Sequence, residues 1–279
     1  MNDQLIKTWF VTGASKGLGL ALVKQLLAAG QKVAATSRTI NDLTTAVGTT
    51  SPNFLPLQVN LADDASVKQA IAQTAATFGT IDVLINNAGY GIGGSLEELT
   101  EAEIHTAFDV NVFGTINTIR HTLPYMRQQQ SGHIINIASI AGFAAATGWA
   151  AYGATKFAIF GLTEVLADDV KAFGIKATVV APGAFRTSFL TGESLALPQN
   201  PIAEYADIRE SHERYLKMNG QQQGDPEKAA AAMIATGFNP NPPVHLFLGS
   251  DAYRRAVAKI ESLTAEIELL KETSRSTDY

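Results

Sequence analysis

The stretch Thr8-Trp9-Phe10-Val11-Thr12-Gly13-Ala14-Ser15-Lys16-Gly17-Leu18-Gly19 decides how this chain folds. Its first four residues are typical of a buried strand, the glycines form a turn, and a helix is predicted from Leu18 to Ala29, where Gly30 ends it. Glycines between a strand and a helix let the backbone approach a pyrophosphate, which the N-terminus of the helix then stabilises. The turn therefore predicts a nucleotide site, with an ordinary tight turn as the alternative.

The same alternation of strand and helix repeats along most of the chain. Further strands are predicted at residues 32–36, 54–59, 83–85, 133–138 and 176–181, and helices at residues 63–78, 101–129 and 152–173. Nearly continuous apolar strands separated by helices indicate a parallel sheet that is covered on both faces. Because crossovers between parallel strands are right-handed, we expect an α/β, doubly wound sheet of Rossmann type, with about seven strands in one domain spanning residues 1–279.

The last third of the chain departs from this regularity. Residues 185–224 are polar and irregular, as in a lid over a substrate site, and residues 225–279 form a helical extension. In the extension, a helix begins at Asp225-Pro226-Glu227 and a last strand covers residues 244–248. The final helix, residues 251–271, has an apolar stripe that predicts core packing or a subunit contact, formed by Val257, Ile260, Leu263, Ile267 and Leu270.

Composition excludes several classes of protein. The 279 residues include no cysteine, so disulfides, thiol nucleophiles and cysteine-ligated metals are impossible, and the five histidines show no metal-ligand spacing. A net charge of −5 without any Lys/Arg block argues against a nucleic-acid partner. Residues 134–155 are uncharged and long enough for a membrane span, but their polar residues and glycines indicate a strand, a loop and a helix start. Without a secretory leader, we expect a cytoplasmic protein with no membrane span.

The glycine turn also matches an unrelated motif. Gly13-Ala14-Ser15-Lys16-Gly17 fits Gly-x-Ser-x-Gly, the nucleophile elbow of α/β-hydrolases, in the correct strand–turn–helix context. A hydrolase needs an oxyanion-hole loop from an earlier strand, yet only twelve residues precede Gly13. The hydrolase interpretation also leaves Gly19 without a role, so nucleotide binding is preferred.

The end of the second predicted strand indicates which nucleotide is bound. An NAD site usually has an acidic residue there, whose carboxylate accepts hydrogen bonds from the ribose hydroxyls. This chain has Thr36-Ser37-Arg38 instead. A carboxylate would repel a 2′-phosphate, whereas Ser37 and Arg38 can bind one, and Lys16 lies within the phosphate turn. The sequence therefore favours NADP(H) over NAD(H), with ordinary surface cations as the alternative.

Tyr152 and Lys156 lie four residues apart, which places a phenol and an ammonium on one face of a predicted helix. A phenol is a poor acid–base catalyst at neutral pH because its unperturbed pKa is near 10. An adjacent ammonium favours the phenolate, so we expect it to lower that pKa. Ser139 ends the fifth predicted strand, at the sheet edge where ligands bind in this architecture.

Together these residues resemble the motifs of the short-chain dehydrogenase/reductase family. Thr12-Gly13-x-x-x-Gly17-x-Gly19 is similar to its cofactor turn, and Asp82-x-Leu84-x-Asn86-Asn87-Ala88-Gly89 to its fourth-strand motif. Pro182-Gly183-x-x-x-Thr187 is similar to its nicotinamide loop, and the catalytic tetrad falls on Asn111, Ser139, Tyr152 and Lys156. The resemblance covers residues 5 to about 190, and the extension beyond it resembles the 17β-hydroxysteroid- and retinol-dehydrogenase-like branch.

The resemblance implies a role for each matched residue. Tyr152 would be the general acid or base, Lys156 would tune it and bind the nicotinamide ribose, and Ser139 would hold the substrate oxygen. Asn111 would hold a water that relays protons. The remaining implied cofactor contacts are Gly13, Ser15, Lys16, Gly17, Leu18, Gly19, Ser37, Arg38, Asn60, Leu61, Asn87, Ala88, Gly89, Pro182, Gly183, Phe185 and Thr187. Two of these depart from the family pattern: Asn60 replaces an aspartate, and Phe185 replaces an aliphatic residue.

The expected activity is NADP(H)-dependent interconversion of a carbonyl and a primary or secondary alcohol. The alternatives are an isomerase or dehydratase that retains its cofactor, and a non-catalytic NADP sensor. We expect a small apolar substrate and a homodimer, with no metal. Substrate contacts are expected from Ser139, Tyr152 and a wall that comprises Tyr90, Ile92, Phe143, Thr147, Trp149, Phe185 and Phe189.

Overall fold

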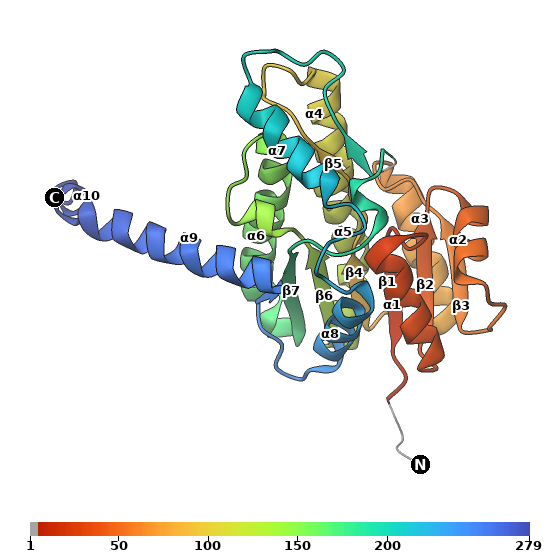
Figure 1. Ribbon diagram of the computed structural model, residues 1–279. Coiled ribbons are helices and arrows are strands. Elements are labelled where there is room, and N and C mark those ends of the chain that lie inside the picture. The colour runs from red at the N-terminus through yellow and green to blue at the C-terminus, as the bar shows by residue number, and fades with distance from the viewer. Residues whose placement is uncertain (1–4, 193) are drawn as a thin grey trace.

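A computed structural model describes residues 5–192 and 194–279, and its centre is one parallel sheet (Figure 1). The sheet has seven strands in the order β3-β2-β1-β4-β6-β7-β9. These strands are β1 (Thr8–Val11), β2 (Lys32–Ser37), β3 (Phe54–Gln58), β4 (Val83–Asn86), β6 (Gly132–Ile137), β7 (Ile175–Pro182) and β9 (His245–Leu248). The predicted doubly wound α/β sheet is confirmed.

Strand order reverses beside β1, which lies between β2 and β4. The chain proceeds outward through β2 and β3 on one side, then returns to β4 and continues to β9 on the other. In open parallel sheets, ligands bind in the crevice at the carboxyl ends of the strands where the order reverses. The glycine turn after β1 and the residues that follow β4 meet at this point.

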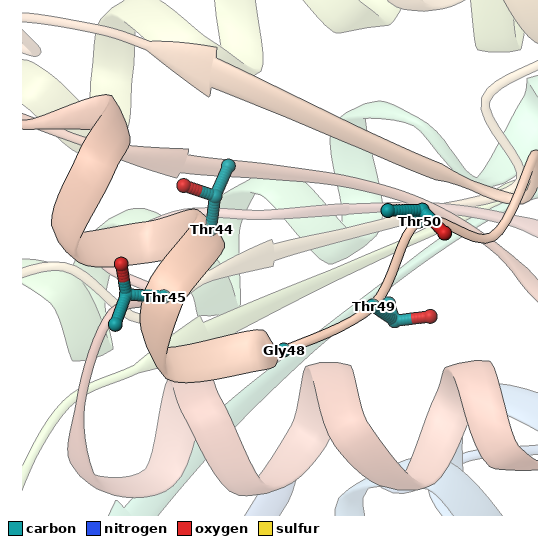
Figure 2. A pocket seen from close by; sticks show the side chains of 5 residues that line it. All are labelled: Thr44, Thr45, Gly48, Thr49 and Thr50. Atoms are coloured by element: carbon teal, nitrogen blue, oxygen red, sulfur yellow. The ribbon is translucent and has the colours of Figure 1, made fainter.

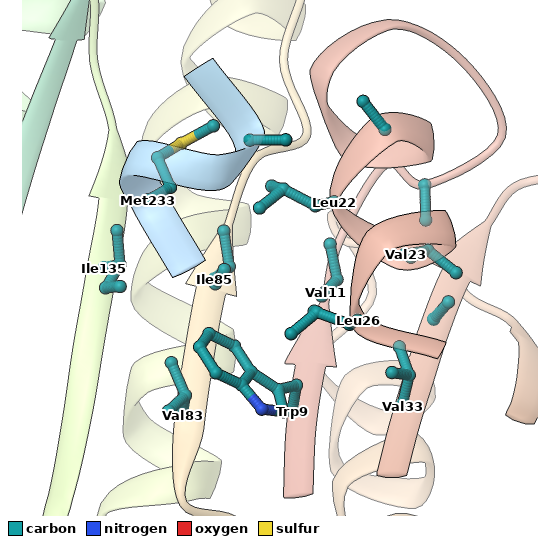
Figure 3. Close-up of a cluster of buried hydrophobic side chains, with 14 of the residues drawn as sticks. Trp9, Val11, Leu22, Val23, Leu26, Val33, Val83, Ile85, Ile135 and Met233 are labelled. Atoms are coloured by element: carbon teal, nitrogen blue, oxygen red, sulfur yellow. The ribbon is translucent and has the colours of Figure 1, made fainter. Parts of the chain in front are cut away.

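One face of the sheet packs against α1 (Gly17–Ala28) and α8 (Pro226–Phe238). Figure 3 shows Trp9 and Val11 of β1 among side chains of both helices, including Leu22 of α1. All three side chains are fully buried. The helix predicted to begin at Asp225 therefore completes this half of the core.

The other face packs against α3 (Asp64–Phe78), α5 (Gly114–Gln129) and α6 (Ala150–Asp169). Phe10 points to this face because successive side chains of a strand alternate between faces. Since both faces are covered, every residue of β1 is buried, and the strand is apolar without alternation.

Two helical segments differ from the sequence prediction. Residues 101–129 were predicted as one helix, but a π-helical turn at Asp109–Phe113 separates α4 (Glu101–Phe108) from α5. The short helix α2 (Ile40–Val47) was not predicted from the sequence, and only two of its side chains are buried.

An open hollow of about 480 Å³ lies at the end of α2. Figure 2 shows the residues that line it, which are Thr44, Thr45, Gly48, Thr49 and Thr50. Because α2 runs from the end of β2 back to the start of β3, this hollow lies at the amino edge of the sheet. It is therefore remote from the crevice where ligands bind in this architecture.

The segment 185–224 is more ordered than predicted. It contains a 3-10 turn (Ser188–Leu190), the short strand β8 (Leu195–Ala196) and the helix α7 (Ala206–Lys217). β8 pairs with β5 (Gly91–Ile92) in a separate two-stranded sheet. The prediction of a wholly irregular lid was wrong because α7 buries serine and histidine side chains, which give no apolar periodicity.

The C-terminal helix α9 (Ser250–Leu269), followed by α10 (Lys271–Arg275), projects from the body of the protein (Figure 1). Only Ala252 and Ala256 of α9 are buried. The apolar stripe along the helix is exposed, so the interpretation as packing in this chain's own core was wrong. None of the helices in residues 5–192 and 194–279 is long and apolar enough to cross a membrane.

Candidate active site

The glycine turn between β1 and α1 packs directly against the residues that follow β4. Gly13 and Gly17 have φ angles of +64° and +57°, a left-handed backbone that glycine adopts without strain. A Cβ atom on Gly13 would lie 2.7 Å from the Cα atom of Ala88. A Cβ atom on Gly19 would lie 2.5 Å from Nδ2 of Asn87. The turn therefore brings two backbone segments together where no side chain fits.

Hydrogen bonds fix this contact. The Asn87 side chain donates to the backbone oxygens of Thr12 and Gly13, both at 3.0 Å. The backbone N–H groups of Asn87 and Ala88 both donate to Oγ1 of Thr12, also at 3.0 Å. Asn87 thus holds the turn in shape, beside the positive end of the α1 dipole. This backbone cradle fits the phosphates of a dinucleotide, since it combines close backbone approach with a helix N-terminus.

The predicted adenosine-side residues lie at the ends of β2 and β3. Ser37, the last residue of β2, is half-buried, and Arg38, which follows it at the carboxyl edge, is exposed. Asn60 is exposed, and its side chain accepts a hydrogen bond from the backbone of Ala62 at 3.2 Å. Leu61 packs so closely on α5 that a Cβ atom on Gly114 would lie 2.9 Å from it.

Asn111 lies in the π-helical turn and is buried. Its Oδ1 atom accepts from the backbone of Tyr90 at 3.0 Å, and its Nδ2 atom donates to the Tyr90 carbonyl at 3.0 Å. Nδ2 also donates to Oγ1 of Thr155, at 3.2 Å, on the helix that carries Tyr152. A π turn widens the helix locally and often occurs at functional sites. Here it joins the segment that follows β4 to the helix α6.

Lys156 is buried, and its Nζ atom donates to the carbonyl of Ile137 at 3.0 Å. The same atom lies 5.9 Å from the centroid of the Tyr152 ring. A Cβ atom on Gly89 would lie 2.9 Å from Oδ1 of Asn111 and 3.2 Å from Nζ of Lys156. Glycine at position 89 therefore leaves room for these two polar groups to approach each other.

Ser139 and Tyr152 come together as the family resemblance implies. Ser139 follows β6 and caps the 3-10 turn Ile140–Gly142, with Oγ accepting from the backbone of Ala141 at 3.1 Å. This turn docks on α6 so tightly that a Cβ atom on Gly142 would lie 2.5 Å from the Lys156 backbone. The docking brings the Ser139 side chain beside the Tyr152 hydroxyl, close enough to act on its pKa.

The protonation of the site differs from the sequence expectation. Burial raises the pKa of the Tyr152 phenol to about 12, although its hydrogen bond with Ser139 acts in the opposite direction. Burial also lowers the pKa of the Lys156 ammonium to about 8. The expected lowering of the Tyr152 pKa by Lys156 is therefore absent, because burial dominates both groups. At neutral pH the phenol keeps its proton.

The loop after β7 is held by the C-terminal extension. The backbone N–H of Gly183, next to Pro182, donates to the Leu248 carbonyl at 2.8 Å. The following N–H, of Ala184, donates to Oδ2 of Asp251 at 2.9 Å. A Cβ atom on Gly183 would lie 2.1 Å from the Asp251 carboxylate, so only glycine fits there. Asp251, at the start of α9, thereby positions the predicted nicotinamide loop.

Further along this loop, two predicted residues take distinct positions. Phe185 pairs with Gly224 through an isolated parallel bridge, which ties the two ends of the 185–224 segment together. Thr187 caps the next 3-10 turn, with Oγ1 accepting from the backbone of Phe189 at 3.3 Å. A Cβ atom on Gly17 would lie 3.5 Å from the Thr187 side chain. The fold therefore brings the nicotinamide loop against the glycine turn.

Aromatic rings surround Tyr152. The Trp149 ring lies 6.0 Å from the Tyr152 ring, edge to face, and the Phe189 ring lies 5.9 Å away. Ile92 and Leu195, from the two strands of the small sheet, belong to the same apolar cluster. Trp149 and Phe189 were both predicted to contact substrate, and the structure places both beside the phenol.

The remaining members of the predicted wall have different positions. Tyr90 packs against the Tyr152 cluster, and the Thr147 backbone oxygen accepts a hydrogen bond from α7. Phe143 instead packs on Phe160 and Phe247, at ring distances of 5.4 and 5.2 Å. No ring contact described in residues 5–192 and 194–279 joins Phe143 to Tyr152. Its aromatic neighbours come from α6 and β9, whose approach the sequence alone did not reveal.

Polar contacts hold the helix α7 against the residues around Trp149 and Glu98. His212 shares a hydrogen bond with the Gly148 carbonyl at 3.0 Å and packs edge to face on Trp149 at 5.3 Å. About one turn earlier in α7, Arg209 forms an ion pair with the buried Glu98 carboxylate. Burial acts to raise the pKa of Glu98, but hydrogen bonds, chiefly from backbone groups, lower it to about 2. The charged Glu98 carboxylate thus holds α7 in place through its ion pair with Arg209.

Sequence reasoning missed four residues that organise the site: Glu98, Arg209, His212 and Asp251. Glu98, Arg209 and His212 lie among other polar residues without a recognisable motif, and the segment 248–252, which contains Asp251, suggested a branch of the family but no role for that carboxylate. Their partners lie 64 to 111 positions away in the chain, as in the His212–Gly148 and Arg209–Glu98 pairs. Only the folded chain brings such partners together.

A family model described as short chain dehydrogenase matches residues 7–196, and this chain belongs to that family. One relative is oxidoreductase BOA17 of Botryotinia fuckeliana, 35% identical over 97% of this chain and 98% of its own. Another is the 3-ketodihydrosphingosine reductase of Bacteroides thetaiotaomicron, 36% identical over 89% of each chain.

A solved short-chain dehydrogenase from Streptomyces avermitilis is 36% identical, covers 99% of this chain and 100% of its own, and has a TM-score of 0.91. Solved neighbours differ in cofactor. ElxO, 26% identical with a TM-score of 0.73 over 87% of this chain and 96% of its own, is bound to NADP. A Burkholderia phymatum protein, 22% identical with a TM-score of 0.82 over 96% of each chain, is in complex with NAD. The shared fold therefore does not set the cofactor preference.

Proposed function

We propose that this protein is an NADP(H)-dependent oxidoreductase that interconverts a carbonyl and a primary or secondary alcohol in the cytoplasm, with Tyr152 as general acid and base. The observation that carries the proposal is that the half-buried Ser139 lies beside the buried Tyr152, whose phenol ring lies next to Lys156. Membership of an oxidoreductase family supports the reaction class.

Tyr152, Ser139 and Lys156 have separate roles in the proposed reduction of a carbonyl. The Tyr152 phenol, whose pKa is about 12, keeps its proton at neutral pH and can donate it to a carbonyl oxygen held by Ser139. A bound nicotinamide cofactor supplies a hydride to the carbonyl carbon in this direction and accepts one in reverse. Lys156, fixed by the Ile137 carbonyl, holds a cationic group beside the phenolate that the proton transfer creates.

Asn111 and the glycine turn position this machinery. Asn111 spans the Tyr90 backbone and Thr155, which fixes α6 relative to the loop after β4. The cradle formed by Gly13, Gly17 and Gly19 would hold the cofactor phosphates at the start of α1. Aromatic and aliphatic side chains around Tyr152 exclude water and favour a small apolar carbonyl or alcohol as substrate.

Ser37 and Arg38 support the choice of NADP(H). Ser37 ends β2 and Arg38 follows it, both at the carboxyl edge, and neither is a carboxylate that would repel a 2′-phosphate. The guanidinium of Arg38 is exposed and can form bidentate hydrogen bonds with a phosphate.

The test measures NADPH and NADH oxidation with a panel of ketones, aldehydes and quinones. We expect turnover with NADPH on at least one carbonyl, and a loss of at least 100-fold in kcat for Tyr152→Phe, which removes one hydroxyl. Tyr125→Phe, on the remote helix α5, is the matched control and should retain activity. Tight NADPH binding without turnover on any substrate would overturn the proposal in favour of a sensor or a cofactor-retaining isomerase.

Cofactor preference is tested separately by binding. Arg38→Ala should weaken NADPH binding about 10-fold or more and leave NADH binding nearly unchanged, because only NADPH carries the 2′-phosphate. Arg127→Ala removes an exposed charge at the end of α5 and should change neither affinity. An unchanged ratio of the two affinities in Arg38→Ala would refute the phosphate assignment.

A further inference from the structure

The exposed stripe that runs along α9 and ends at Leu270, the residue between α9 and α10, has the spacing of a two-stranded coiled coil. Ile260, Leu263, Ile267 and Leu270 follow one another at intervals of three, four and three residues, with isoleucine and leucine alternating. These are the a and d positions of a heptad repeat, and β-branched residues at a with leucine at d favour two strands. Tyr253 extends the a series by one heptad toward the body of the protein.

Within the part of the chain that the structure describes, this stripe has no partner. The exposed fractions of Ile260, Leu263, Ile267 and Leu270 are 52%, 44%, 60% and 55%. In contrast, Ala252 and Ala256 near the start of α9 pack against Ile140 and Ala144. Figure 1 shows the rest of α9 extending away from the body, with the C-terminus at its far end. A 20-residue helix is about 30 Å long. A helix that is polar all round would need no partner, but this one has a continuous apolar face.

The charges on α9 and α10 identify the kind of partner. From Val257 to Arg275 there are four acidic and three basic residues, so the segment is not cationic. Helices that bind anionic lipid surfaces are rich in lysine and arginine on their polar face, and this one is not. At the positions that flank the stripe, Glu266 and Lys271 have opposite charges. Heptad position g of one strand faces position e of the other, so these two residues can pair between two copies of the helix.

We infer that α9 is a self-association surface, on which the a and d stripe of one copy of this chain packs against the same stripe of a second copy. A second copy supplies the identical repeat and the complementary flanking charges, which a coiled-coil seam requires. The surface lies outside the active site, so the inference is independent of the proposed function. It concerns a contact made by the tip of α9, in addition to any other contact between subunits.

The first test compares Ile267→Glu with Leu269→Glu by light scattering. Both residues are exposed, at 60% and 82%, so neither change perturbs the fold of the single chain, which circular dichroism checks. Ile267 lies on the stripe, whereas Leu269 lies off it. Because the contact is two-fold, Ile267→Glu places two carboxylates in one seam and should weaken association at least 100-fold. The mass of the assembly should then halve relative to wild type, with Leu269→Glu unchanged.

The second test uses the fact that the chain has no cysteine. Leu263→Cys and Leu269→Cys each introduce one thiol, and the two proteins are oxidised under identical conditions. Facing residues in a seam come within the 4.4–6.8 Å Cα separation that a disulfide requires, so Leu263→Cys should cross-link. Equal cross-linking of the two variants, or an assembly mass that Ile267→Glu leaves unchanged, would overturn the inference.

Discussion

Substituting alanine for Gly13 tests how the glycine turn is built, and Gly30 provides a matched control. Both glycines have a left-handed backbone, with φ of +64° and +72°. A Cβ atom on Gly13 would lie 2.7 Å from the Ala88 Cα atom, whereas a Cβ atom on Gly30 would meet nothing within 4 Å. The two substitutions therefore cause similar backbone strain and differ in whether the new methyl group collides with Ala88.

The magnitudes follow from these two contributions. A left-handed backbone costs a non-glycine residue roughly 1–2 kcal/mol, so Gly30→Ala should lower the free energy of unfolding by about that amount. Overpacking against a fixed backbone adds roughly 1–3 kcal/mol, so Gly13→Ala should lose about 2–5 kcal/mol. For a chain of this size each kcal/mol shifts Tm by roughly 2–4 °C, so the two variants should differ by about 2–12 °C.

Thermal unfolding followed by circular dichroism measures this difference, and NADPH titration adds a second readout. Gly13→Ala displaces Ala88 and the Asn87 hydrogen bonds that hold the turn, so under the proposed function it should also weaken NADPH binding. Gly30→Ala should leave binding unchanged. Equal Tm values for the two variants would show that the turn does not pack on Ala88 and would refute this account.

Three further predictions concern charged groups. Glu98→Gln should loosen the attachment of α7, because it removes the charge that pairs with Arg209. Amide hydrogen exchange across residues 206–212 should then become faster. Glu210→Gln, an exposed change on the same helix, should leave the exchange rates unchanged. Burial lowers the pKa of His133 to about 3, below its unfolded value near 6.5. Between about pH 3 and 6.5 the unfolded chain therefore binds more protons than the folded chain, so the free energy of unfolding should fall as the pH falls through this interval. Denaturant titrations at several pH values measure this dependence, and His133→Phe should reduce it. Finally, the ammonium of Lys156, with a pKa of about 8, should lose its proton in mildly alkaline solution, so carbonyl reduction should decline as pH rises through about 8. A pH–rate profile that stays flat from 7 to 9 would contradict this role.

Local features of the sequence predicted the sheet and most of the candidate site. Strand β1 was recognisable because burial on both faces requires an uninterrupted apolar run, and the glycine turn because only glycine allows Gly13 to approach Ala88. Helical periodicity places Tyr152 and Lys156 on one face, and the family resemblance marks them as the candidate acid–base pair. In each case the physical requirement acts on neighbours in the chain.

Other features depended on distant contacts. The helix α7 has a buried face that includes Ser211 and His212, which bond to the backbone carbonyls of residues 147 and 148. Because these buried side chains are polar, the sequence shows no apolar periodicity that would predict the helix. Phe143 looked like a pocket residue but packs with Phe247, which is more than 100 positions away. The π turn that carries Asn111 also went unpredicted, because a single widened turn leaves no periodic signal.

The sequence by itself determined the parallel sheet and the glycine turn after β1, because these depend on local periodicity and on the residue type at each position. Its resemblance to the dehydrogenase family indicated the candidate tetrad. Only the tertiary structure decided the protonation of Tyr152, since its pKa reflects how completely the surrounding elements bury it. The tertiary structure also decided that α9 leaves the body of the protein. An amphipathic stripe specifies that a helix needs an apolar partner, but only the arrangement of the other elements shows whether its own chain provides one.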